Sequence, residues 1–70
     1  MYNLKYKVMI NKRKEEIEKY LKEIHLCCNA LSRAIQRDSS KAEIMSIESM
    51  QSTLKVIVAL QKELQRLRGG

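Results

Sequence analysis

Apolar residues stand at mirror-image positions on the two sides of the short run Asp38-Ser39-Ser40. Two antiparallel helices joined by a tight turn produce such a pattern, because residues equally far from the turn lie at the same level of the hairpin. We therefore expect a helical hairpin whose core is built from these mirrored residues. Four apolar pairs are equidistant from Ser39: Leu31 with Ile47, Cys28 with Met50, Ile24 with Leu54, and Leu21 with Ile57.

The composition favours helix throughout the chain. There is no proline, and the only two glycines are the last two residues, so the usual interior helix breakers are missing. Seventy residues make one small domain, and ordering it costs roughly 1.5 kcal/mol per residue, which a single small core rarely offsets. Two cysteines cannot form a dense disulfide framework. A partner chain is therefore expected to contribute to stability.

The first helix is predicted over residues 12–37, where apolar residues recur in three adjoining columns. A two-stranded coiled coil needs only two apolar positions in seven, so a face of three in seven indicates packing against more than one neighbour. The columns are Ile10, Ile17, Ile24 and Leu31; Leu21, Cys28 and Ile35; and Tyr20, Cys27 and Ala34.

The turn carries its own signal for the start of a second helix. Ser40-Lys41-Ala42-Glu43 matches the capping box S-x-x-E, in which the serine and the glutamate side chains each bond a backbone N–H of the other residue. We therefore expect Ser40 to be the N-cap. Few residues remain to reverse the chain, and none of them is glycine. So short a connection predicts antiparallel neighbouring helices.

The second helix is predicted over residues 41–68, followed by the terminal glycines. Its centre, residues 54–60, is apolar on nearly every side, so one neighbouring helix cannot cover it. Two hairpins packed as a four-helix bundle would cover this region and the wide face of the first helix. The predicted self-association residues are Val56, Val58 and Leu60.

Residues 1–11 are predicted to form a basic N-terminal arm ahead of a helical hairpin domain of residues 12–70. Apolar and polar residues alternate over residues 2–10, which favours an extended or strand-like arm. A helical extension competes with it, because Tyr6 and Ile10 also continue the apolar stripe of the first helix. The sequence leaves both alternatives open.

A strand that displays Asn3, Lys5 and Lys7 on one face, with two helices after it, resembles the ribbon-helix-helix repressors. The resemblance covers the order of the elements and these three polar positions. It implies a dimeric ribbon that reads the major groove of DNA. The stretch 12–37 is much longer than the first helix of that family, and the family's glycine-containing loop has no counterpart.

Positive charge is concentrated near the two ends of the chain. Residues 1–14 hold five bases and no acid, residues 15–65 are nearly balanced, and two arginines follow, within a net charge of +6. A hairpin brings both basic segments to the same end, where they suit an acidic protein surface or a nucleic acid. The predicted partner-binding residues are Lys5, Lys7, Lys12, Arg13, Lys14, Arg66 and Arg68.

The sequence offers no set of side chains typical of an active site. It has one histidine, His25, and no glycine-rich phosphate loop or Ser/His/Asp set. Cys27 and Cys28 point about 100° apart on a helix, so we interpret them as small apolar residues and leave a redox role open. His25 and Cys28 could complete a metal site only across two chains. We expect no enzymatic activity, metal, cofactor or small-molecule substrate.

No apolar run reaches the roughly 20 residues of a membrane span, and the first residues lack the apolar segment of a signal peptide. We therefore expect a cytoplasmic protein with reduced thiols and no membrane contact. The predicted function is that of a non-enzymatic binding protein of the adaptor, inhibitor or co-chaperone type, which acts through protein–protein contact as a homodimer. The alternative is a nucleic-acid-binding regulator that uses the basic arm, ribbon-helix-helix-like or otherwise.

Overall fold

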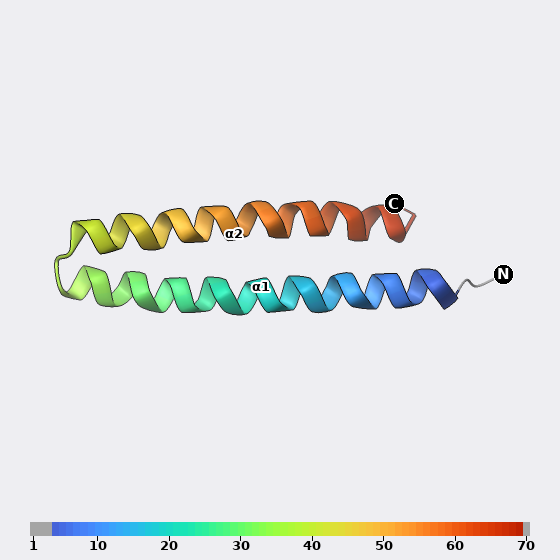
Figure 1. The fold of residues 1–70 in the computed structure, drawn as a ribbon, viewed down its shortest axis with the longest axis horizontal. Helices are drawn as coiled ribbons and strands as arrows, with labels where there is room; N and C mark the ends of the chain where they lie inside the picture. The colour runs from blue at the N-terminus through green and yellow to red at the C-terminus, as the bar shows by residue number, and fades with distance from the viewer. Residues whose placement is uncertain (1–3, 70) are drawn as a thin grey trace.

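The chain folds into two long antiparallel helices that pack against each other (Figure 1). The structure is a computed structural model and describes residues 4–69. Helix α1 spans Leu4–Gln36 and helix α2 spans Ser40–Leu67. Both chain ends lie at one end of the hairpin, which we name the open end, and the turn lies at the other. The predicted all-helical hairpin is confirmed.

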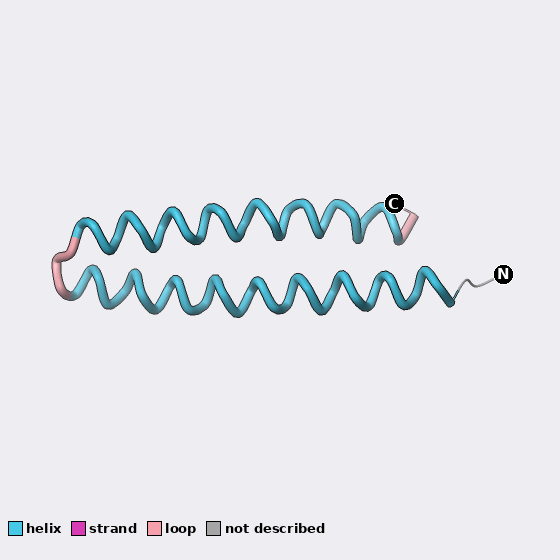
Figure 2. Tube along the Cα trace, in the orientation of Figure 1, coloured by secondary structure: helices cyan, strands magenta, loops and turns pink. Residues whose placement is uncertain are grey.

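The described part of the predicted N-terminal arm is helical. Helix α1 runs through residues 4–11 without a break, and Figure 2 shows no strand among residues 4–69. Helix is therefore the alternative that the structure shows for residues 4–10, whereas Tyr2 and Asn3 lie outside the described residues. A continuous helix keeps Met9 and Ile10 half-buried at the level of the last turn of α2. The alternating pattern gave no information about this long-range packing.

Helix α1 ends in a Schellman motif that is formed without glycine. Asp38 takes a left-handed backbone conformation with φ of 54°, and its N–H donates to the Ile35 carbonyl at 3.1 Å. The next N–H, that of Ser39, donates to the Ala34 carbonyl at 3.0 Å. These two bonds satisfy carbonyl groups that the end of a helix leaves without partners.

Ser39 is the N-cap of α2, so the prediction of Ser40 as the cap is wrong by one residue. The backbone of Ser39 is extended, and its Oγ accepts a hydrogen bond from the Ala42 N–H at 3.4 Å. The Ser39 carbonyl accepts the first helical bond, from the Glu43 N–H at 3.0 Å. Ser40 is already the first helical residue. Because the Schellman motif fixes Ser39 in an extended conformation, this serine is the one placed to cap.

A seam of half-buried and buried side chains lies between the two helices. Its positions alternate three and four residues apart on each helix and mirror one another about the peptide bond between Asp38 and Ser39. Antiparallel coiled-coil packing produces this spacing. The seam consists of Ile10, Arg13, Ile17, Tyr20, Ile24, Cys27, Leu31 and Ala34 on α1, and Glu43, Ser46, Met50, Thr53, Ile57, Leu60, Leu64 and Leu67 on α2.

The hairpin is thin, so little of it can be buried. Its extents are 58 × 15 × 12 Å and its radius of gyration is 16.2 Å, whereas a compact chain of this length has a radius of about 11 Å. Among the described residues, only Ala34 and Leu64 are buried apolar residues. Most of the apolar side chains that the sequence supplies therefore remain at least partly in contact with water.

Candidate functional site

Exposed apolar side chains from both helices line one long side of the hairpin. Cys28 of α1 directly follows the seam residue Cys27. Ile47 and Leu54 of α2 likewise follow the seam residues Ser46 and Thr53. In an antiparallel pair of helices, residues in these equivalent heptad positions lie on the same side of the seam. The Cys28 Sγ lies 3.6 Å from the Met50 Sδ, which places Cys28 against α2 on that side. We name this surface the apolar face: Leu21, Cys28 and Ile35 of α1 with Ile44, Ile47, Leu54 and Val58 of α2.

The apolar face differs from the expected core. Leu21, Cys28, Ile47 and Leu54 were assigned to the core by the mirror pattern, but all four are exposed. The chain has three apolar columns on α1, and packing against one helix covers only two of them. The column Leu21, Cys28 and Ile35 is the one left over. Its seven-residue spacing was visible in the sequence, although the sequence alone did not tell which column would remain uncovered.

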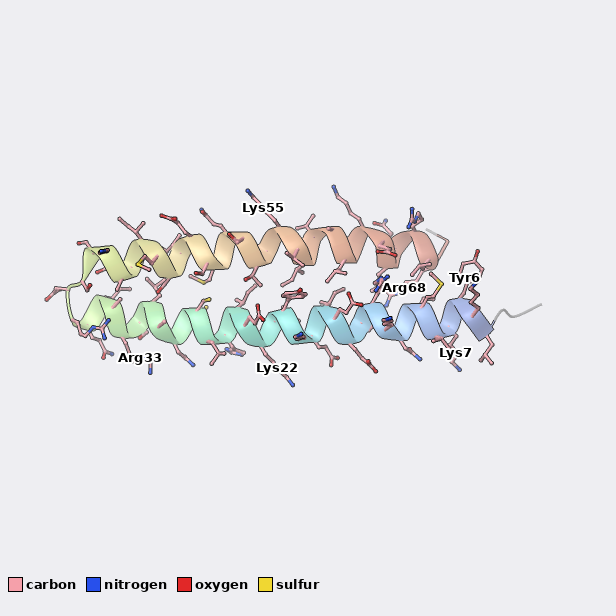
Figure 3. All side chains as sticks on the ribbon, in the orientation of Figure 1. Tyr6, Lys7, Lys22, Arg33, Lys55 and Arg68 are labelled. Carbon is pink, nitrogen blue, oxygen red and sulfur yellow. The ribbon has the colours of Figure 1, made fainter. Side chains whose placement is uncertain are left out.

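No Asp, Glu, Lys or Arg side chain belongs to the apolar face between its outermost members. Lys22, Arg33 and Lys55 occur in the same stretches of chain but belong to other helix columns. Figure 3 shows Lys22 and Lys55 pointing away from the facing helix. Burying the apolar face against protein would therefore not require the removal of one of these charges from water.

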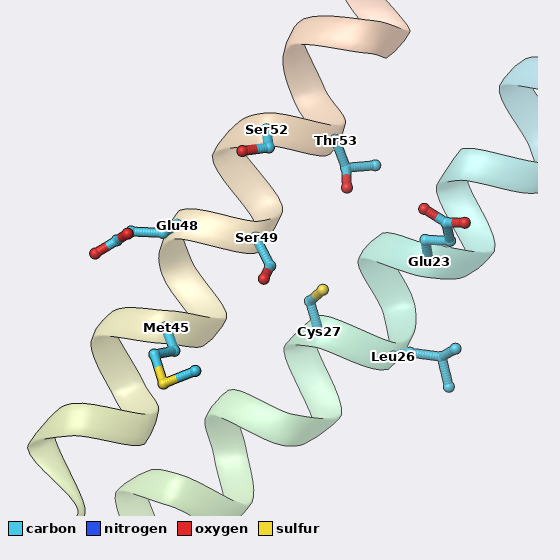
Figure 4. Close-up of a pocket in the computed structure, with 8 residues that line it drawn as sticks. All are labelled: Glu23, Leu26, Cys27, Met45, Glu48, Ser49, Ser52 and Thr53. Atoms are coloured by element: carbon cyan, nitrogen blue, oxygen red, sulfur yellow. The ribbon is translucent and has the colours of Figure 1, made fainter.

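A shallow groove with a mixed polar and apolar lining, which we name the mixed groove, lies on the opposite side of the seam from the apolar face. Figure 4 shows that Glu23 and Glu48 come from different helices and that Glu48 points away from α1. The two carboxylates therefore do not form a pair of the kind that acid–base catalysis uses. The groove is lined by Glu23, Leu26, Cys27, Met45, Glu48, Ser49, Ser52 and Thr53.

The hairpin brings all seven predicted partner-binding residues to the open end. Lys5, Lys7, Lys12, Arg13 and Lys14 lie in the first turns of α1, and Arg66 and Arg68 lie where α2 ends. Figure 3 shows the labelled Lys7 and Arg68 at this end, together with Tyr6. The structure thus places the two basic segments together, as the sequence predicted for a hairpin.

Arg13 is part of the seam and differs in this from the other basic residues. Its Nε lies 3.2 Å from the Glu63 Oε2, an ion pair that is not aligned as a hydrogen bond, and its Nη1 donates to the Glu16 carboxylate. The interaction with Glu63, with a smaller contribution from Glu16, raises the pKa of Arg13. An arginine is charged near neutral pH even without this shift, so the ion pair does not change the charge of the guanidinium. Arg13 connects the helices and is only 25% exposed.

The three predicted self-association residues lie on different sides of the hairpin. Val58 belongs to the apolar face and is exposed. Val56 is also exposed, but it lies on the side of the mixed groove. Leu60 is half-buried in the seam, where it packs within its own chain. The apolar centre of α2 is therefore divided among two surfaces and the seam.

The remaining sequence predictions concern thiols, metals and membranes. Cys27 and Cys28 are both free, one half-buried in the seam and one exposed. Among residues 4–69, no group of three or more His, Cys, Asp or Glu side chains could hold a metal ion. Neither α1 nor α2 contains a stretch apolar and long enough to cross a bilayer. Comparisons of the chain with protein-family models, with curated proteins and with solved structures give no match.

Proposed function

We propose that this protein is a non-enzymatic helical binding protein that acts through protein–protein contact as a homodimer. The observation that carries the proposal is the apolar face. Four of its residues, Leu21, Ile35, Ile47 and Leu54, are 42% to 55% exposed in the single hairpin. Monomeric soluble proteins rarely leave contiguous apolar surface of this kind in water, and such a patch marks an interaction site.

A second hairpin is the occupant that the helix pattern favours. In a four-helix bundle each helix contacts two neighbours and uses about three positions in seven, which is the width of the apolar stripe on α1. Two hairpins stacked on their apolar faces would have this architecture. The open ends would then remain available for a further partner, whose surface we expect to be acidic because the open end gathers the basic residues named above.

Sedimentation equilibrium over a range of protein concentrations tests the homodimer. We expect a species of twice the chain mass of 8.2 kDa, which dissociates only on dilution or on substitution within the apolar face. A folded protein that remains at the mass of one chain at high concentration would contradict the proposal. Circular dichroism on the same samples shows whether the helices are formed, so that an unfolded sample is not mistaken for a monomer.

A second candidate function is nucleic-acid binding through the open end. It is favoured by the convergence of Lys12, Lys14 and Arg68 from the two helices at that end. The ribbon-helix-helix arrangement is not what residues 4–10 adopt, since they are helical. Nucleic acid would therefore be bound by helix ends and not by a β-ribbon. Binding of labelled duplex DNA or RNA at low salt, followed by fluorescence anisotropy, tests this candidate.

A further inference from the structure

The residues that α1 contributes to the apolar face are arranged symmetrically about Cys28. Leu21 stands seven residues before it and Ile35 seven residues after it, both on the apolar face. Seven residues are two turns of helix, so each leucine or isoleucine lies roughly 10 Å from the level of Cys28. If α1 is turned end over end about the level of Cys28, Leu21 and Ile35 exchange places.

The residues that α2 contributes to the apolar face show the same symmetry about the level of Met50. Ile47 and Leu54 flank Met50 and Gln51, and Ile44 and Val58 flank them one turn further out. The contact of 3.6 Å between the Cys28 Sγ and the Met50 Sδ shows that the two centres lie at the same level. A single axis that lies in the plane of the face, perpendicular to both helices, therefore relates the apolar positions of the whole face.

A face with this symmetry is complementary to a second copy of itself. Twofold interfaces are isologous, which means that the same patch serves on both subunits and that each contact occurs twice. Reversal about the axis beside Cys28 and Met50 places Leu21 over Ile35 of the second copy and Ile47 over Leu54 of the second copy. An unrelated partner would have no need for this internal symmetry.

The charges at the open end favour the same orientation. Lys14 and Arg68 lie in the same two columns as the apolar face, but beyond it towards the open end. If two hairpins stacked with their turns together, these cations of one copy would face those of the other. In the reversed orientation they lie outside the overlap, where water solvates them, so like-charge repulsion is avoided.

The overlap is large enough for a stable dimer. About 20 residues of each helix overlap, which at 1.5 Å per residue and a helix spacing of 8–10 Å is roughly 30 Å by 20 Å on each subunit. Both subunits together then bury on the order of 1,200 Å², which is within the range of specific protein interfaces.

We infer that the apolar face docks on the apolar face of a second copy in antiparallel, staggered orientation, with a twofold axis beside Cys28 and Met50. The inference rests on the proposed homodimer and adds its geometry. Helix α1 faces α1 of the second copy, the two Cys28 side chains lie next to each other at the axis, and the two open ends project from opposite ends of the dimer.

Crosslinking of single-cysteine chains tests this geometry. Cys27→Ser leaves Cys28 as the only thiol and Cys28→Ser leaves Cys27, so the two variants differ only in the position of the thiol. Each variant is treated with a short bismaleimide at a concentration where sedimentation shows a dimer. We expect covalent dimer from the chain that keeps Cys28 and at least about tenfold less from the chain that keeps Cys27, because Cys27 lies in the seam towards the mixed groove.

Mass and crosslinking separate the two levels of the proposal. A dimer that crosslinks through Cys28 supports both, and a dimer that crosslinks equally well or better through Cys27, or through neither thiol, overturns the geometry while the homodimer stands. A folded monomer overturns both.

A mixture of Leu21→Cys and Ile35→Cys chains, each without the native cysteines, should also crosslink, whereas either chain alone should not. Crosslinking of either chain alone would contradict the reversed orientation.

Discussion

Ser39 serves both helices because Asp38 before it adopts a left-handed backbone conformation. The conformation of Asp38, with φ of 54°, turns the Ser39 N–H back towards the Ala34 carbonyl, and the Ser39 Oγ then accepts from the Ala42 N–H. One residue thus ends α1 and begins α2. The reversal of the chain and the relative register of the helices both depend on these two positions.

Replacing Asp38 by glycine should be more favourable than replacing it by alanine. Both changes remove the carboxylate, but only glycine adopts positive φ without steric cost. We expect Asp38→Gly to be more stable than Asp38→Ala by about 1 kcal/mol in the free energy of unfolding. Urea denaturation followed by circular dichroism at one fixed protein concentration measures the difference. Equal midpoints would show that the turn does not hold Asp38 in this conformation in solution.

Ser39→Ala should destabilise the hairpin by about 1 kcal/mol, the usual cost of removing an N-cap side chain. Ser40→Ala is the matched control, because Ser40 is exposed and already helical. For this control we expect a change within about 0.5 kcal/mol. Thermal unfolding of both variants at equal concentration compares them. A larger loss of stability in Ser40→Ala than in Ser39→Ala would show that Ser40 is the N-cap, as the capping box in the sequence predicted.

Val58→Glu should weaken the dimer, and Val56→Glu should not. The two valines are alike in chemistry and lie on one helix, but only Val58 belongs to the apolar face. A carboxylate at Val58 would be buried twice in the symmetric dimer, so we expect the dissociation constant to rise on the order of a hundredfold. Sedimentation equilibrium gives both constants. If the two substitutions weakened the dimer equally, the interface would include the whole apolar centre of α2 and not only the side on which Val58 lies.

If the second candidate function holds, affinity for nucleic acid should fall steeply with salt. Each cation that contacts a phosphate contributes about one unit to the slope of log affinity against log salt. Lys12→Ala with Lys14→Ala should reduce the slope by about two, whereas Lys22→Ala, far from the open end, should leave it unchanged. Anisotropy titrations at several salt concentrations measure the slope. Absence of binding at low salt would exclude this function and leave a protein partner.

The helices and the turn were predictable because local signals agree with one another. The lack of interior breakers, the seven-residue spacing and the cluster Asp38-Ser39-Ser40 all indicate two helices and one reversal. The choice of the cap was not predictable to the residue, since both Ser39 and Ser40 carry a suitable hydroxyl. The hydrogen bond from the Ser39 N–H to the Ala34 carbonyl, which ends α1, distinguishes the two serines.

The apolar face was harder to predict because apolar residues exceed what two helices can bury together. The mirror pattern about Ser39 pairs seam residues of one helix with face residues of the other, as in Ile24 with Leu54. The actual seam also contains Arg13, Ser46 and Thr53, which a search for apolar residues passes over. The ion pair of Arg13 with Glu63 explains why a cation is tolerated there.

The common location of both chain ends has a consequence for how strongly the proposed dimer could hold a partner. Each open end offers one binding region, and the staggered arrangement would fix two such regions at opposite ends of a stiff helical rod. A target that carries two matching acidic sites at that separation would be held by both, and the second contact would form at high effective concentration. Weak single contacts would then give tight binding, and a target with one site, or with sites at another spacing, would be released quickly.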